Sequence, residues 1–135
     1  ALMLRFMLDT NILIYTIRTR PEGVRRHFEV HDGEMCASSV TAMELLYGGH
    51  KSRDVRRNLD VVEGLLARIE ILDFGLGAAD HAAQIRATLA SAGTPIGPFD
   101  VMIAGHARST GLCLVTNNLR EFERVDGLRL ENWAT

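Results

Sequence analysis

Apolar residues along the chain fall into two kinds of run. Short runs without a helical face are typical of buried strands, whereas runs with apolar positions three or four residues apart are typical of amphipathic helices. The short runs predict strands at 4–8, 35–37, 71–74, 112–115 and 128–130. The longer runs predict helices at 12–17, 21–30, 41–49, 54–69, 78–92, 98–109 and 119–124. Strands separated by helices favour parallel pairing. The pattern therefore predicts a three-layer α/β/α domain over residues 1–135, with a central parallel sheet of four to five strands.

Polar residues mark the expected helix ends. Asn11 is a candidate N-cap for the first helix, and Ser38, Ser39 or Thr41 for the third. Thr41 and Glu44 also fit the capping-box pattern. Gly48-Gly49 is expected to end that helix. These predictions rest on a few neighbouring residues, and tertiary packing can favour a different helix end.

Composition places the chain among ordinary globular proteins. It has 135 residues, 47% hydrophobic and 24% charged, enough for one domain with a substantial core. No run approaches the ~20 apolar residues that a membrane span requires. Cys36 and Cys113 lie in apolar runs without metal-ligand spacing, so we expect reduced core cysteines and a cytoplasmic protein.

The charge balance leaves a nucleic-acid partner open. The formal net charge is −2, but the cations are fourteen arginines and a single lysine, Lys51. Arginines cluster within 18–26 and 53–57. Arginine suits bidentate phosphate contacts, whereas a solvated helix face is the alternative reading of the same clusters.

Four polar side chains stand near predicted strand ends. Asp9 directly follows the first strand, Glu44 lies in the helix after the second, and Asn118 follows the fourth. Ligands of open α/β sheets bind outside the carboxyl ends of the strands. Asp9 is therefore either a site residue or a helix cap, and its position alone leaves both open. Asp100 precedes the fourth strand, so it reaches the same edge only if the Pro/Gly loop at 94–98 turns the chain back.

Carboxylates that share one place repel each other and lose hydration. They persist when a hard divalent cation neutralises them, and Mg²⁺ prefers such oxygen ligands. A cation held in this way activates water in phosphoryl displacement. If the three acids converge, they predict this chemistry.

Four stretches together resemble a known family. They are Met7-Leu8-Asp9-Thr10-Asn11, Thr41-Ala42-Met43-Glu44-Leu45, Gly97-Pro98-Phe99-Asp100-Val101-Met102-Ile103-Ala104, and Val115-Thr116-Asn117-Asn118 running into Glu121-Phe122. In order and separation they resemble the PIN-domain ribonucleases, and within them the VapC toxins of bacterial toxin–antitoxin modules. Asp-centred phosphoacceptor domains also have an Asp after the first strand, but they use a Lys near the late strands that this chain lacks.

The resemblance implies a site and a reaction. Asp9, Glu44 and Asp100 would be metal ligands, and the family's fourth acidic position falls on the amide Asn118. Supporting roles are implied for Thr10, Asn11, Thr116 and Glu121, although Glu121 also reads as a solvated helix residue. The implied activity is Mg²⁺-dependent cleavage of RNA, often tRNA, with Mn²⁺ as a second candidate ion.

The resemblance also implies partners. A VapB-type antitoxin would silence the enzyme, the chain would form a homodimer, and toxin and antitoxin would form a larger hetero-oligomer, without any membrane. The alternative is a PIN-fold protein that binds RNA or a partner and is catalytically weak or inactive. The missing fourth acid supports this alternative, whereas the three intact acids argue against it.

Overall fold

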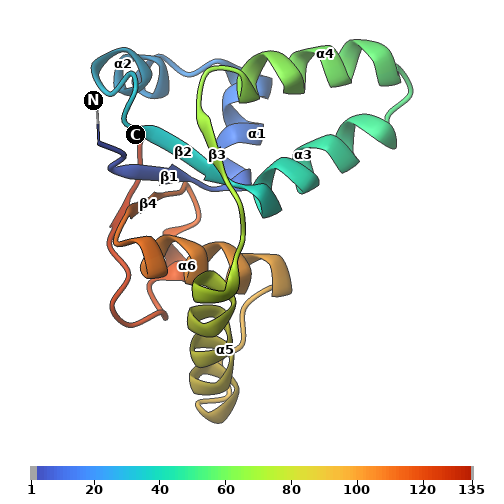
Figure 1. The fold of residues 1–135 in the computed structure, drawn as a ribbon. Helices are drawn as coiled ribbons and strands as arrows, with labels where there is room; N and C mark the ends of the chain where they lie inside the picture. Colours follow the sequence, from blue (N-terminus) through green and yellow to red (C-terminus); the bar gives the residue numbers. More distant parts are fainter. Residues whose placement is uncertain (1–2, 135) are drawn as a thin grey trace.

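The sheet lies at the centre of the molecule, and all its strand pairs are parallel. The structure is a computed structural model that describes residues 3–134. Its strands run in the order β3-β2-β1-β4-β5 (Figure 1). They are β1 (Phe6–Leu8), β2 (Met35–Ser38), β3 (Glu70–Leu72), β4 (Cys113–Val115) and β5 (Leu130–Glu131). Five parallel strands between helices confirm the predicted three-layer α/β fold.

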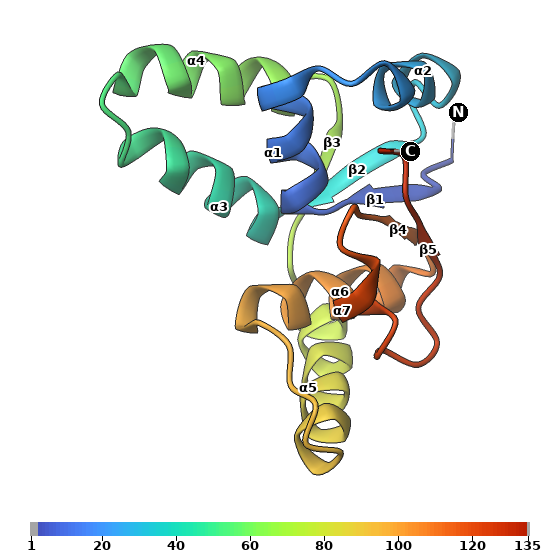
Figure 2. The same ribbon diagram turned by 180° about the vertical axis from the view of Figure 1, so that it is seen from behind.

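Helices cover both faces of this sheet. They are α1 (Thr10–Thr19), α2 (Glu22–Val30), α3 (Ser39–His50), α4 (Val55–Leu66), α5 (Leu76–Ser91), α6 (Pro98–Thr110) and α7 (Leu119–Phe122). The first four lie on one side of the sheet or at its edge, and the last three lie on the other (Figures 1 and 2). The α3–α4 hairpin projects away from the sheet in both views.

Alternation along β1 divides the core into two clusters. Phe6 and Leu8 pack with α1, α2 and α4 on one face, whereas Met7 packs with α5 and α6 on the other. Side chains of successive strand residues point to opposite faces, so a strand covered on both sides is apolar throughout. This explains why the strand runs carry no polar alternation.

Helices α5 and α6 cross at very close range. A Cβ atom added at Gly105 of α6 would lie 2.5 Å from the backbone nitrogen of Ala82 in α5. Real Cβ atoms essentially never come that close to backbone. The glycine therefore sets the distance between the two helices and, with it, the position of the first turn of α6.

Three predictions about helix ends were wrong. Asp9, not Asn11, caps α1, because its Oδ1 accepts a hydrogen bond of 2.8 Å from Ile12 N. Ser38, one of the three candidate caps, is confirmed as the cap of α3 because its hydroxyl accepts from Val40 N, whereas the Thr41–Glu44 capping box is not formed.

Gly48-Gly49 does not end α3, which continues to His50. Gly49 serves packing instead, since a Cβ there would lie 2.7 Å from Cδ2 of Leu59 in α4. Other bounds moved by one to three residues: β3 ends at Leu72, α5 begins at Leu76 and β5 covers Leu130–Glu131.

The two cysteines that the sequence placed in the core are buried, and so is the single tryptophan. Cys36 and Cys113 are free and buried. Trp133 is 1% exposed and stacks on His27 at a ring-centroid distance of 4.6 Å, which anchors the last part of the described chain on α2. Within residues 3–134, each helix is too short or too polar to cross a membrane.

Candidate active site

The candidate site lies where the strand order reverses direction. β1 pairs with β2 on one side and with β4 on the other, and the crevice at such a switch point is the usual ligand site of open α/β sheets. Asp9 N donates to Val115 O over 3.0 Å. This bond holds the start of α1 beside the turn that links β4 to α7.

Asp9 is buried with one oxygen unused. Its side chain follows β1 and is 1% exposed. Oδ1 accepts the Ile12 amide, but Oδ2 has no hydrogen-bond partner among the described residues. Burial raises the pKa of Asp9 from 3.8 to about 6, and the charge of Glu44 adds to the rise, while the nearby Thr116 side chain and the Ile12 amide lower it. A buried carboxylate oxygen without a partner is costly, so it indicates a ligand.

Glu44 is oriented by two threonine hydroxyls. Thr10 donates a hydrogen bond of 2.6 Å to Glu44 Oε1. The hydroxyl of buried Thr41 lies 3.2 Å from that of Thr10 and can donate to it in turn. The chain of hydroxyls fixes Glu44 from the start of α1.

Asp100 reaches the same crevice, as the resemblance implied. It lies in the first turn of α6. Its pKa is raised to about 7 by partial burial, by a hydrogen bond and charge repulsion with Glu121, and by the charges of Asp9 and Glu44. The charges of Asp9, Glu44 and Glu121 therefore all act on Asp100, and the loop before α6 does turn the chain back to the carboxyl edge.

For Glu121, only a supporting role or a solvated helix position was predicted. It lies in the first turn of the short helix α7, close enough to Asp100 to raise the pKa of that carboxyl. The sequence signal was its position three residues after Asn118, which puts it on the side of a short helix next to the strand end. The chain thus has a fourth carboxylate at the crevice, although the fourth family position carries an amide.

The remaining predicted residues lie around the acids. Thr116 is buried, and its hydroxyl accepts a hydrogen bond of 2.9 Å from Asn118 N. The Asn118 and Asn11 side chains line an open pocket beside the acids. Their catalytic and supporting roles stay predictions.

The acids fit a divalent cation that keeps several waters. Within residues 3–134, no three His, Cys, Asp or Glu side chains stand close enough to hold an ion unaided. Mg²⁺ commonly binds through one or two carboxylates, with waters and substrate phosphate completing its octahedron. The free Oδ2 of Asp9 and the repulsion that Asp100 meets from the other three carboxyls are the features such an ion would relieve.

The raised pKa values predict a pH dependence of stability. Because the pKa values of Asp9 and Asp100 rise from 3.8 to about 6 and about 7, the folded chain binds protons more tightly than the unfolded chain. This contribution is complete below about pH 4 and is lost as pH rises through 6 and 7. Without metal, the contribution of these groups to the free energy of unfolding should therefore fall from pH 5 to pH 8.

Urea denaturation in EDTA at both pH values measures this change, with the Asp9→Asn/Asp100→Asn double variant as the reference. The wild type should lose more stability than the double variant over this range. An equal loss in both would contradict the assignment of these groups.

Comparison with known proteins agrees with the fold. A family model described as PIN domain matches residues 6–128. The chain is 61% identical over 132 residues to the tRNA(fMet)-specific endonuclease VapC of Shigella flexneri, covering 98% of this chain and 100% of that protein. It is 52% identical to Ribonuclease VapC2 of Haemophilus influenzae, with the same coverage.

The chain is also similar in fold to a solved structure. A chain in the crystal structure of DNA-bound VapBC from Salmonella typhimurium superposes with a TM-score of 0.94 and 58% identity, covering 96% of this chain and 98% of that one. An open parallel sheet with carboxylates gathered at its switch point defines the class. The chain belongs to the PIN-domain family and, within it, to the VapC ribonucleases.

Proposed function

We propose that this protein is the toxin of a type II toxin–antitoxin module, a Mg²⁺-dependent endoribonuclease that cleaves tRNA in the cytoplasm, with Mn²⁺ as the alternative ion. The buried, unpartnered Oδ2 of Asp9 carries the metal assignment. Asp9, Glu44 and Asp100 are the proposed ligands. The tRNA substrate is supported by the name of the Shigella flexneri relative.

The side chains of the proposed site have different roles. A divalent cation bound here supplies positive charge that activates water and offsets charge on the phosphate. Asp9 presents one fixed oxygen, because its cap to Ile12 and its burial leave it no freedom. Thr10 holds Glu44 in place. Asp100 and Glu121 lie in contact, with the pKa of Asp100 raised to about 7, so Asp100 can hold a proton near neutral pH.

The proposed activity is tested by incubating purified protein, free of any antitoxin, with tRNA(fMet) and with an elongator tRNA. We expect cleavage with Mg²⁺ or Mn²⁺ and none with EDTA. Cleavage that persists in EDTA would reject the metal-dependent mechanism. A protein that binds these RNAs but leaves them intact with either ion would favour the alternative of an inactive RNA-binding PIN protein.

Glu121 should replace the missing fourth acid. Glu121→Gln keeps the shape but removes the charge next to Asp100, so we expect at least a 10-fold loss of cleavage and a need for more Mg²⁺. A Mg²⁺ titration of the initial rate measures both. Glu123→Gln, an exposed acid two residues away, is the matched control. Equal titration curves for the two variants would place Glu121 outside the site.

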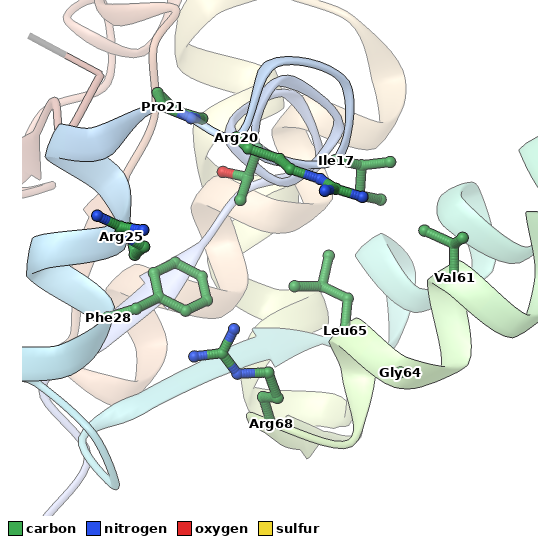
Figure 3. A pocket seen from close by; sticks show the side chains of 10 residues that line it. Ile17, Arg20, Pro21, Arg25, Phe28, Val61, Gly64, Leu65 and Arg68 are labelled. Atoms are coloured by element: carbon green, nitrogen blue, oxygen red, sulfur yellow. The ribbon is translucent and has the colours of Figure 1, made fainter.

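The proposed VapB-type antitoxin has a suitable surface outside the acidic crevice. The relevant pocket, of about 410 Å³, lies between α1, α2 and α4. Figure 3 shows Phe28 and Leu65 at its centre, with Arg20, Arg25 and Arg68 around them. The Arg68 guanidinium lies 5.3 Å from the Phe28 ring centroid, and none of the three arginines forms a salt bridge among residues 3–134. An apolar floor with free cations suits a segment that carries apolar and acidic side chains.

Neutralising this pocket should separate inhibition from catalysis. The triple variant Arg20→Gln/Arg25→Gln/Arg68→Gln is expected to bind the antitoxin at least 10-fold more weakly while cleaving RNA at the wild-type rate. The control replaces the exposed Arg53, Arg56 and Arg57 with Gln. Calorimetry measures the affinity for the antitoxin. An unchanged affinity of the first triple variant would mean that the antitoxin binds elsewhere.

The proposed homodimer also has an apolar surface available. A hollow of about 690 Å³ over α5, α6 and the loop before α6 is lined mainly by apolar residues, among them Phe74, Leu89 and Ile96. Light scattering of the free toxin tests for a dimer, and mixing with antitoxin tests for the larger assembly.

The single domain over 1–135 likewise stays a prediction.

A further inference from the structure

A second pocket adjoins the acidic crevice on the other side of α1 from the α3–α4 hairpin. It measures about 540 Å³ and is lined by Asn11, Ile14, Tyr15, Arg18, Thr19, Asn117 and Asn118. The Asp9 N to Val115 O bond places its two walls, α1 and the β4–α7 turn, side by side. Asn11 is two residues from Asp9, and Asn118 is three from Glu121. Anything bound here would therefore lie next to the proposed cleavage site.

The polar groups of this pocket are unused by the fold. Among residues 3–134, the side-chain polar groups of Asn11, Tyr15, Arg18, Asn117 and Asn118 make no hydrogen bond or salt bridge with other residues. Asn118 touches Thr116 only through its backbone amide. No carboxylate lines the pocket, in contrast to the adjacent crevice. Free amides, one half-buried aromatic ring and one free guanidinium face a single hollow.

These groups match the chemistry of an unpaired nucleotide. Each Asn amide offers donors and an acceptor, and such amides recognise the edges of bases. Proteins that read single-stranded RNA stack splayed bases on aromatic rings or guanidinium planes and hydrogen-bond their exposed edges. The pocket volume falls within the ~300–1,000 Å³ of pockets for small ligands.

We propose that this pocket holds an unpaired base of the RNA next to the cleaved phosphate, so that Asn11 and Asn118 select the cleavage site. Tyr15 provides the stacking surface and Arg18 contacts the neighbouring phosphate. The inference rests on the proposed function and adds to it a preference for a base in a loop. It also gives Asn118 a role that an acid could not perform, since a carboxylate would repel the RNA and lacks the amide donors.

Binding and cleavage together test the inference. The RNAs are stem-loops that carry each of the four bases, or an abasic residue, beside the cleavage site. Binding is measured by fluorescence anisotropy in EDTA, so it does not depend on catalysis. We expect the wild type to bind the preferred base at least 10-fold more tightly than the abasic RNA. Asn11→Ala/Asn118→Ala should abolish this difference and lower kcat/KM for the preferred RNA about 10- to 100-fold.

Controls separate this pocket from its neighbours. Asn58→Ala removes an exposed amide from the groove on the opposite side of α1, between α1, α3 and α4. If that variant loses base discrimination while Asn11→Ala/Asn118→Ala retains it, the base lies in the other groove and the inference is overturned. Weaker Mg²⁺ binding by Asn118→Ala, measured by calorimetry, would instead make Asn118 a metal ligand. If Asn11→Ala/Asn118→Ala binds the antitoxin more weakly but still discriminates between the RNAs, the pocket binds the antitoxin.

The nuclease proposal and the base pocket can fail separately in these experiments. If the wild type fails to cleave any RNA with metal, the proposed activity falls. The anisotropy comparison of normal and abasic loops still accepts or rejects the base pocket. Equal affinity of the wild type for both RNAs rejects it in every case.

Discussion

The Asp9→Asn variant should lose RNA cleavage and gain stability at pH 8. Asparagine caps helices as well as aspartate, so the bond from Ile12 N survives. The variant removes a buried negative charge whose pKa is raised from 3.8 to about 6, and a shift of this size corresponds to roughly 3 kcal/mol. We expect the free energy of unfolding to rise by about 1–3 kcal/mol and cleavage to fall by at least about 10²–10³-fold.

The measurements are urea denaturation in EDTA at pH 8 and the cleavage rate with Mg²⁺. Asp9→Ala is the informative comparison, because it also removes the charge but loses the cap, which costs about 1 kcal/mol. It should be as inactive as Asp9→Asn yet less stable. Asp60→Asn on the exposed face of α4 should leave both quantities unchanged. An Asp9→Asn variant that is inactive because it is unfolded would show that Asp9 serves the fold rather than the chemistry.

Gly105→Ala should destabilise the protein severely, although alanine is the better helix former. Helix propensity alone predicts a gain of about 1 kcal/mol. The new methyl group, however, would lie 2.5 Å from Ala82 N and 2.7 Å from Ala82 Cα. Because these are backbone atoms, α5 and α6 must separate, and we expect a net loss of about 3 kcal/mol or more.

Thermal unfolding measures this loss, and Gly77→Ala in α5 is the control. A Cβ at Gly77 meets nothing within 4 Å, so that variant should be as stable as the wild type or slightly more stable. The Gly105→Ala variant should also cleave RNA poorly at temperatures where it is folded, since displacement of α6 moves Asp100. A melting temperature equal to that of the control would mean that the helices can separate at little cost.

The fold could be predicted because strands that are buried on both faces of a parallel sheet appear in the sequence as short apolar runs. Asp9 and Glu44 were placed near the crevice by the same logic, since Asp9 directly follows β1 and Glu44 lies in the helix that follows β2. Helix ends were less predictable, because one hydroxyl can serve several partners. Thr41 fits a local cap by sequence, but α3 begins two residues earlier, and the Thr41 hydroxyl contacts Thr10, thirty-one residues away.

The Asp100–Glu121 contact could not be inferred from local pattern. It depends on how closely α6 packs on α5, which Gly105 sets, and on the direction of the turn after β4. Both are long-range outcomes of packing. The resemblance implied a place for Asp100 at the crevice, whereas it directed attention to Asn118 rather than to the acid that lies near Asp100.

The strand order has a consequence for when the enzyme becomes active. Asp9 and Glu44 come from the first third of the chain, whereas Asp100 and Glu121 come from its last third, and β1 joins the two parts by pairing with both β2 and β4. During synthesis, the proposed catalytic centre is therefore incomplete until β4 and α7 have left the ribosome. A cell that makes such a ribonuclease is protected from unfinished copies, and the antitoxin has only completed molecules to restrain.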